Sequence, residues 1–258
     1  MKDKLKDLIK FNKFMGLFHL IQAVFMLIVA LTVEKVIDFK PVIVSNFLEY
    51  NKVLDRLITV TKTVFNLPFG ILVASFLFLS AAFHFIISSK KYKNKYMDGL
   101  KNHINEFRWY EYALSSSIMI VLIAVLMGVY DIGALILIFG LNASMNLFGL
   151  LMEKINLDNK KVSWLPFIYG SIAGILPWIV LFMYAFGNSN PAEVPWFVYA
   201  IFGSYFIFFN LFPINMILQY KRIGKWKDYL YGERIYIILS LVAKSILAWL
   251  VFFGVMQP

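Results

Sequence analysis

A single lysine stands in an otherwise apolar stretch near the C-terminus, SLVAKSILAWLVFFGV, in which Lys244 is the only charged residue. A lysine at the centre of a membrane-spanning helix costs roughly 2.5 to 3.5 kcal/mol, so it needs a partner or a chemical role. Loss of water favours the neutral amine, and a neutral amine can attack an aldehyde to form a Schiff base. Lys244 therefore marks a candidate site for covalent attachment of a carbonyl compound.

The partner that we expect for this lysine is Glu111, in FRWYEYALSSSIMI. It is the only carboxylate well inside an apolar stretch, because Asp131, Glu153, Glu193 and Glu233 stand at the ends of such stretches. At about 1.5 Å per helical residue, the lysine and Glu111 lie at similar depths if their two helices run in the same direction. The pair is either a plain salt bridge or a protonated Schiff base with its counterion.

Composition indicates that lipid surrounds these two residues. Of the 258 residues 60% are hydrophobic, and mean hydropathy is +0.73, whereas soluble domains contain roughly 45 to 50% apolar residues. Seven apolar stretches approach or exceed the roughly 20 residues that cross a bilayer: 11–33, 66–89, 105–129, 131–152, 163–186, 195–219 and 231–256. We expect an all-α membrane protein, a single seven-helix domain over residues 1–258. The absence of cysteine excludes disulfides and thiolate chemistry.

The basic residues alternate between the two sides of this predicted bundle. Nineteen of the 25 Lys and Arg fall in the N-terminal head and the even-numbered connections, five fall in the loop 34–65, and the last is Lys244. Positive residues favour the cytoplasmic side, so we expect a multi-pass protein of the cell membrane with its N-terminus cytoplasmic and its C-terminus extracellular. This alternation explains the net charge of +10 without nucleic-acid binding.

The loop 34–65 is the only long connection between the predicted helices. Its segments PVIV and LITVT are rich in β-branched residues, which predicts a short antiparallel hairpin in the first extracellular loop. The basic connection SSKKYKNKYMDGLKNH, which contains His103, is either a solvated loop that sets the topology or a contact for lipid or a cytoplasmic signalling partner.

Polar residues inside the stretches come in pairs spaced by three or four residues, which puts each pair on one helix face. The pairs are His19 with Gln22, Ser80 with His84, Glu111 with Ser115, and Asn142 with Asn146. They lie at the level of Lys244 or nearer the N-terminal side, whereas the other half of the bundle is almost entirely apolar. The two histidines are either hydrogen-bonded core residues or a proton reservoir, and the apolar half argues against outward proton pumping.

With seven helices and an inside N-terminus, the segments RWYEYALSSSIMI, LSLVAKSILAWL and LNASMNLFGL closely resemble the heliorhodopsins over essentially the whole chain. The resemblance implies all-trans retinal bound covalently to Lys244, with Glu111 as the sole carboxylate counterion. It also implies a hydrated cavity that holds His19 and His84, and a homodimer packed through the fourth and fifth helices under the first outer loop. Ser240 stands four residues before the lysine, where the usual microbial pumps carry Asp.

Five further residues are predicted to line a retinal pocket, because they lie on faces that suit a polyene. They are Met145 and Gly149 on the fourth helix, and Phe206, Phe209 and Met216 on the sixth. The resemblance makes Phe209 the strongest of these, since pumps usually have Trp there. Trp249 is either part of the pocket roof or a lipid anchor.

The favoured function is a light-sensing photoreceptor, in which retinal isomerises and the Schiff-base proton moves to the inner polar cluster. One alternative is a light-gated proton or ion channel, and another is a transporter in which Lys244 and Glu111 form only a salt bridge. The sequence has no glycine-rich phosphate loop, zinc-helix motif or serine-nucleophile motif. We therefore do not expect an enzyme.

Overall fold

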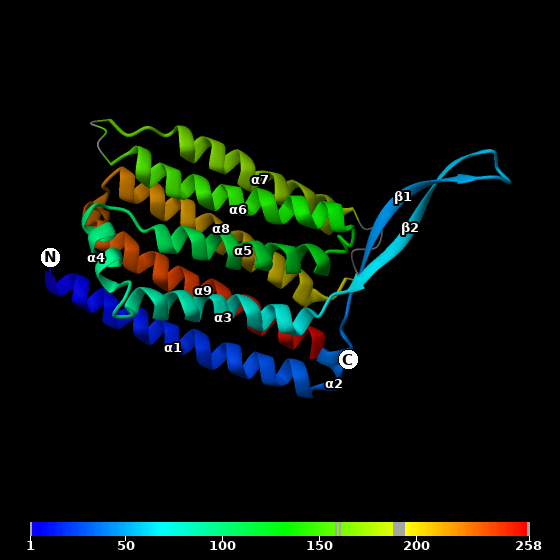
Figure 1. The fold of residues 1–258 in the computed structure, drawn as a ribbon, viewed down its shortest axis with the longest axis horizontal. Helices are drawn as coiled ribbons and strands as arrows, with labels where there is room; N and C mark the ends of the chain where they lie inside the picture. Colours follow the sequence, from blue (N-terminus) through cyan, green and yellow to red (C-terminus); the bar gives the residue numbers. More distant parts are fainter. Residues whose placement is uncertain (1, 158, 160, 188–193, 257–258) are drawn as a thin grey trace.

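The computed structural model describes residues 2–157, 159, 161–187 and 194–256. Within these residues seven helices are long and apolar enough to cross a membrane, and they lie side by side in one bundle (Figure 1). This confirms the predicted all-α, seven-helix membrane fold. The helices are α1 (Lys2–Thr32), α3 (Phe69–Ser88), α5 (Glu106–Leu126), α6 (Ile132–Ile155), α7 (Leu165–Phe186), α8 (Trp196–Tyr220) and α9 (Tyr229–Met256).

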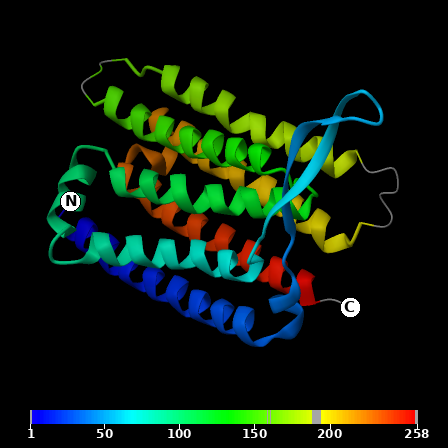
Figure 2. The ribbon, with the colours of Figure 1, turned by 45° about the vertical axis from the view of Figure 1, so that its right-hand side comes forward.

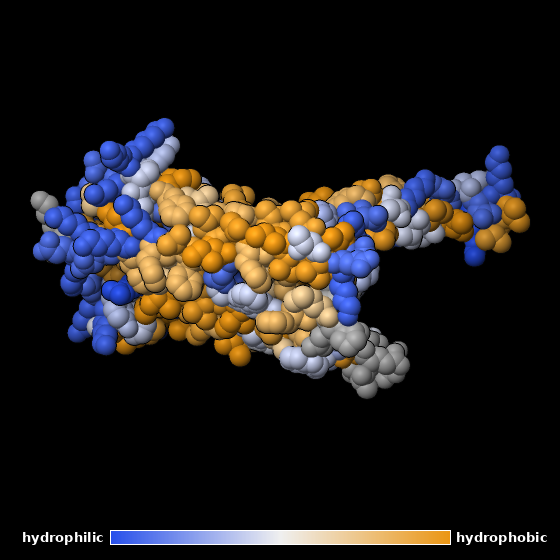
Figure 3. Space-filling model, turned by 90° about the horizontal axis from the view of Figure 1, so that it is seen from below, coloured by the Kyte–Doolittle hydropathy of each residue, from blue (hydrophilic) through white to orange (hydrophobic). Residues whose placement is uncertain are grey.

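The two ends of the bundle hold different elements of the chain. Helix α1 begins at one end, beside the short helix α4 (Lys93–Lys101), and α9 finishes at the other (Figures 1 and 2). We call these the N-terminal end and the hairpin end. Hydrophilic side chains gather at the N-terminal end, and apolar side chains cover the middle of the bundle on the face shown in Figure 3. This distribution is that of a protein whose middle lies in lipid.

The N-terminal end holds two helical segments that the apolar stretches alone do not predict. Helix α1 begins nine residues before the expected stretch, and α4 forms within the basic connection. Leu5 and Leu8 of α1 pack against Tyr96 and Leu100 of α4 in one buried cluster. These contacts explain why the lysine-rich head is helical, because it has an apolar face to bury.

Strands β1 (Val42–Asn51) and β2 (Arg56–Asn66) form the predicted antiparallel hairpin, with Val42 opposite Asn66. Helix α2 (Glu34–Asp38) precedes them. The strands are longer than expected, and the hairpin projects beyond the bundle (Figure 1). At its base, the backbone N–H of Val44 donates to the carbonyl oxygen of Tyr130 at 3.0 Å, which ties the hairpin to the α5–α6 turn.

Helices α5 and α9 hold the candidate site inside the bundle. Helix α5 lies between α3 and α6 in Figure 1 and is the most buried of the seven spans. Its start is fixed by Asn105, whose side-chain oxygen accepts the backbone N–H of Arg108 at 3.2 Å. Between the site and the hairpin end, Met26, Phe76 and Phe252 belong to one large buried apolar cluster.

Candidate functional site

The structure brings Lys244 of α9 and Glu111 of α5 into direct contact. Lys244 Nζ lies 2.6 Å from Glu111 Oε1, and the two residues are 3% and 6% exposed. Two serines complete the polar contacts: Ser80 donates to the same carboxylate oxygen at 2.6 Å, and Lys244 donates to Ser240 Oγ at 2.9 Å. The side chains therefore form a closed hydrogen-bonded group at a depth where a single charge would be very costly.

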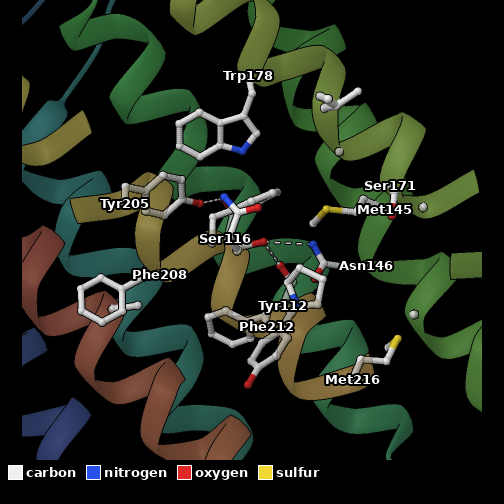
Figure 4. A pocket seen from close by; sticks show the side chains of 18 of the residues that line it. Tyr112, Ser116, Met145, Asn146, Ser171, Trp178, Tyr205, Phe208, Phe212 and Met216 are labelled. Carbon is white, nitrogen blue, oxygen red and sulfur yellow. Dashed lines mark hydrogen bonds between the residues drawn. The ribbon is translucent and has the colours of Figure 1, made fainter. Parts of the chain in front are cut away.

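A cavity of about 480 Å³ extends from this group between α5, α6, α7, α8 and α9 (Figure 4). Its wall includes Lys244 and Ser240, and most of the remaining wall is apolar or aromatic. All five residues that the sequence predicted for a pocket lie in this wall: Met145, Gly149, Phe206, Phe209 and Met216. The volume falls within the roughly 300 to 1,000 Å³ of typical small-molecule sites.

Several aromatic residues of the wall were not anticipated from the sequence. They include Trp109, Tyr112, Trp178, Tyr205 and Phe212. The Trp178 ring centroid lies 5.0 to 5.6 Å from those of Tyr205, Phe206 and Phe209. The Trp178 indole therefore packs against three aromatic rings on this side of the cavity. A lysine amine within an aromatic wall suits a large apolar aldehyde. Lys244 and the wall residues therefore fit retinal.

Two glycines allow large side chains to approach in this wall. A Cβ on Gly149 would stand 2.2 to 2.6 Å from the Trp109 ring, and one on Gly174 would stand 2.5 Å from Met145 Sδ. Real Cβ contacts are essentially never this short. Trp109 and Met145 therefore occupy their places because residues 149 and 174 have no side chain.

We predict that Gly149→Ala lowers the midpoint of thermal unfolding, because the added Cβ overpacks against the Trp109 ring and overpacking costs about 1 to 3 kcal/mol. Gly140→Ala on the same helix is the matched control, since an added Cβ there meets nothing within 4 Å. Circular dichroism of the two variants in detergent measures the difference. Equal midpoints would contradict the packing that we describe around Trp109.

The two predicted histidines lie together on the N-terminal side of the pair. The rings of His19 and His84 stack with centroids 5.5 Å apart, and His84 Nδ1 is 2.8 Å from Asn12 Oδ1. Asn12 also donates to the Tyr96 hydroxyl at 3.1 Å, and burial raises the pKa of Tyr96 well above its usual value. Neither ring nitrogen of His19 has a hydrogen-bond partner among the described residues.

A smaller cavity of about 40 Å³ joins this polar side to Glu111. Its wall contains Asn12, Ser80, His84, Glu111 and Ser240. A cavity of this size holds a water molecule when polar groups line it. The pair therefore borders a polar space toward the N-terminal end and the apolar cavity on its other side.

The remaining predicted residues differ in burial and in whether they line the large cavity. Ser115 is fully buried one turn along α5 from Glu111, whereas Gln22 is half-buried and donates weakly to its own helix at Phe18. Asn142 does not line the large cavity; it donates to Ser116 and Ser117 instead. Trp249, which stacks on Phe253, and His103, which is exposed, also lie outside that wall. Asn146 is part of the wall.

A buried charge cluster closes the bundle at its N-terminal end. The guanidinium of Arg108 forms ion pairs with both Glu153 and Glu233, and the three residues are 7%, 4% and 0% exposed. Trp109 Nε1 donates to Glu153 Oε2 at 2.7 Å, and Asn105 Nδ2 donates to Glu233 Oε2 at 2.9 Å. Since Trp109 also lines the large cavity, one indole ring connects that cavity with the charge cluster.

The sequence placed Glu153 and Glu233 at the ends of their stretches but did not predict that they meet Arg108. Arg108, Glu153 and Glu233 do stand near span ends, but α5, α6 and α9 converge there and bury all three. The sequence did contain a signal for this cluster. Arg108, Glu153 and Glu233 stand near the ends of three spans, and those ends lie on the same side of a seven-helix bundle. Charge complementarity between span ends would have identified them.

We predict that Arg108→Gln destabilises the protein far more than Glu153→Gln. Loss of the arginine leaves two buried carboxylates without a cation, and removing one partner of a buried pair costs about 3 to 5 kcal/mol. Glu153→Gln leaves one arginine facing one carboxylate and keeps an acceptor for Trp109. Thermal unfolding midpoints in detergent compare the two, and an equal loss in both variants would contradict a shared-cation arrangement.

A seven-helix membrane bundle with a buried lysine–carboxylate pair in the wall of an aromatic cavity defines a rhodopsin-type protein. The heliorhodopsin family model matches residues 8–256, so the chain belongs to the heliorhodopsin family. Membership makes it a light-sensing, multi-pass membrane photoreceptor with a retinal chromophore rather than a classical enzyme. No curated protein matches the chain at a significant level.

Proposed function

We propose that Lys244 holds all-trans retinal covalently through Nζ and that Glu111 is its counterion. The observation that carries this proposal is the 2.6 Å contact between Nζ and the carboxylate in the wall of the 480 Å³ cavity. Bound retinal supplies absorption of visible light and a change of shape on isomerisation. Ser80 and Ser240 orient the carboxylate and the nitrogen through the hydrogen bonds already described.

The residues on the N-terminal side provide a destination for the proton that Nζ carries. His19 and His84 lie within the membrane-spanning helices, and the polar cavity beside Glu111 includes His84 and Asn12. Imidazole accepts a proton near neutral pH in ordinary surroundings. The unpartnered ring nitrogens of His19 support a role in receiving a proton, since buried polar atoms usually have partners.

A sensor, not an outward pump, is the function that this arrangement favours. Toward the hairpin end the interior is the large apolar cluster, which includes Ile123, Leu181 and Phe252. Such packing excludes water, and no carboxylate, amine or imidazole is among the described side chains of that cluster. Proton movement confined to one half of the bundle changes the internal charge without net transport.

The test is a recording of current from cells that express the protein under voltage clamp. We expect no sustained current during illumination, together with a light-induced change in the visible absorption spectrum. A sustained current whose size follows the membrane potential would instead establish the alternative, a light-gated proton or ion channel. Lys244→Ala supplies the control for light responses of the cell itself.

The positive-inside distribution supports a cytoplasmic N-terminal end and an extracellular hairpin. Accessibility of an added N-terminal tag in intact and permeabilised cells tests this orientation. The homodimer through α6 and α7 stays a prediction from the family resemblance. The cytoplasmic signalling partner stays a prediction from the basic connection at residues 88–103. Exposed apolar side chains on those helices, among them Ile136, Leu137 and Ile172, suit either lipid or a second copy.

A further inference from the structure

A third cavity, of about 290 Å³, lies at the N-terminal end of the bundle. It is formed by the start of α1, the end of α4 and the turn between the short helix η2 (Gly224–Lys227) and α9. Its wall shares no residue with the large cavity. The wall residues are Lys4, Leu5, Leu100, Lys101, His103, Lys227, Asp228, Tyr229 and Leu230.

The wall carries more positive than negative charge. Three lysines and one aspartate leave a formal net charge of +2 with histidine neutral. Lys4 forms a salt bridge with Asp228, and Lys101 forms one with Asp98, each with 2.7 Å between Nζ and a carboxylate oxygen. No ion pair among the described residues includes Lys227. The cavity therefore keeps at least one cation without a carboxylate partner.

The shape of this wall is held by contacts within the protein. The His103 backbone adopts the left-handed conformation, with φ of 59°, and its ring stacks on Tyr229 at 4.8 Å between centroids. Burial alone would raise the pKa of the Asp228 carboxyl, but bonds from Lys4 and the Leu230 N–H hold that pKa below its usual value. Asp228 therefore stays ionised and fixes the start of α1 against the start of α9.

The wall combines cations with apolar side chains, of which Leu5 and Leu100 are 3% and 1% exposed. Lysine binds phosphate groups as a flexible point charge. Basic pockets between membrane helices, at the level of the lipid head groups, bind anionic lipids. We propose that this cavity binds a phosphate group, carried either by an anionic lipid or by a free phosphate compound.

Isothermal titration calorimetry of the full-length, retinal-treated protein in detergent tests this site, with a phosphate-free buffer. The probes are dioctanoyl phosphatidic acid, inorganic phosphate, and dioctanoyl phosphatidylcholine as the lipid without net charge. Lys227→Gln removes the unpaired cation of the wall. Lys225→Gln is the matched control, because Lys225 is exposed on the same short helix but does not line the cavity.

We expect saturable binding of phosphatidic acid that weakens about fivefold in Lys227→Gln, the usual effect of one lysine beside an anionic surface, and is unchanged in Lys225→Gln. Inorganic phosphate that binds with the same dependence on Lys227 would identify free phosphate as the source. Binding of the lipid alone would identify a head group. Equal weakening in both variants, equal binding of phosphatidylcholine, or no saturable binding of either phosphate probe would overturn the proposal.

Discussion

We expect alanine in place of Lys244 to leave the retinal-treated protein without a visible absorption band. The variant has no amine at the wall of the aromatic cavity, so retinal added to it absorbs only as the free aldehyde. Absorption spectra of wild type and variant, prepared with equal amounts of all-trans retinal, measure the effect. Lys154→Ala, which removes an exposed lysine at the end of α6, keeps the band.

Loss of Lys244 also leaves Glu111 buried without its cation, which by itself destabilises the bundle. The double variant Lys244→Ala with Glu111→Gln removes both charges and separates misfolding from loss of the attachment site. We expect it to fold, by circular dichroism, and still to lack the band. A band of unchanged strength in either variant would rule out attachment at this lysine.

We expect glutamine in place of Glu111 to shift the visible band to the red. In the proposed arrangement, the carboxylate would stabilise positive charge on the linkage nitrogen more in the dark state, where that charge is concentrated, than after excitation. At an effective dielectric constant of 20, a charge pair about 4 Å apart contributes on the order of 4 kcal/mol. The variant loses this stabilisation mainly in the dark state, so the energy of the electronic transition falls.

The matched control is Glu106→Gln, the same substitution on the same helix at a carboxylate that pairs with Lys154. It leaves the band in place, because Glu106 lies at the start of α5, about 8 Å along the helix axis from Glu111. An unmoved band in Glu111→Gln would mean that another group neutralises the nitrogen. Spectra recorded at one pH and one salt concentration make the two variants comparable.

Much of the fold follows from the sequence, because lipid imposes a simple rule on helix length and composition. Six of the seven spans begin and end within three residues of the expected stretches, whereas α1 begins nine residues early. The rule concerns residues inside lipid, and it carries no information on the polar head, where Leu5 and Leu8 form a helix face against α4. β-Branched residues predicted the hairpin but not its length.

Lys244 and Glu111 were predictable because charged residues stand out within apolar stretches. One lysine and one carboxylate in apolar stretches are conspicuous, and opposite charges at equal depth have few other partners. The cavity wall offers no such contrast, since 18% of the chain is aromatic and nothing distinguishes Trp178 from a lipid-facing ring. Arg108 escaped notice because a charge near a span end usually reaches solvent, and only the convergence of α5, α6 and α9 buries it.

Attachment of retinal at Lys244 can be located directly in the intact protein. Reduction of the retinal-treated protein with borohydride fixes the linkage, and mass spectrometry of its peptides then locates the added group. Attachment at Lys244 predicts one retinyl group per chain, on the peptide that contains this lysine. A retinyl group on another of the lysines, or none on any peptide, would contradict it.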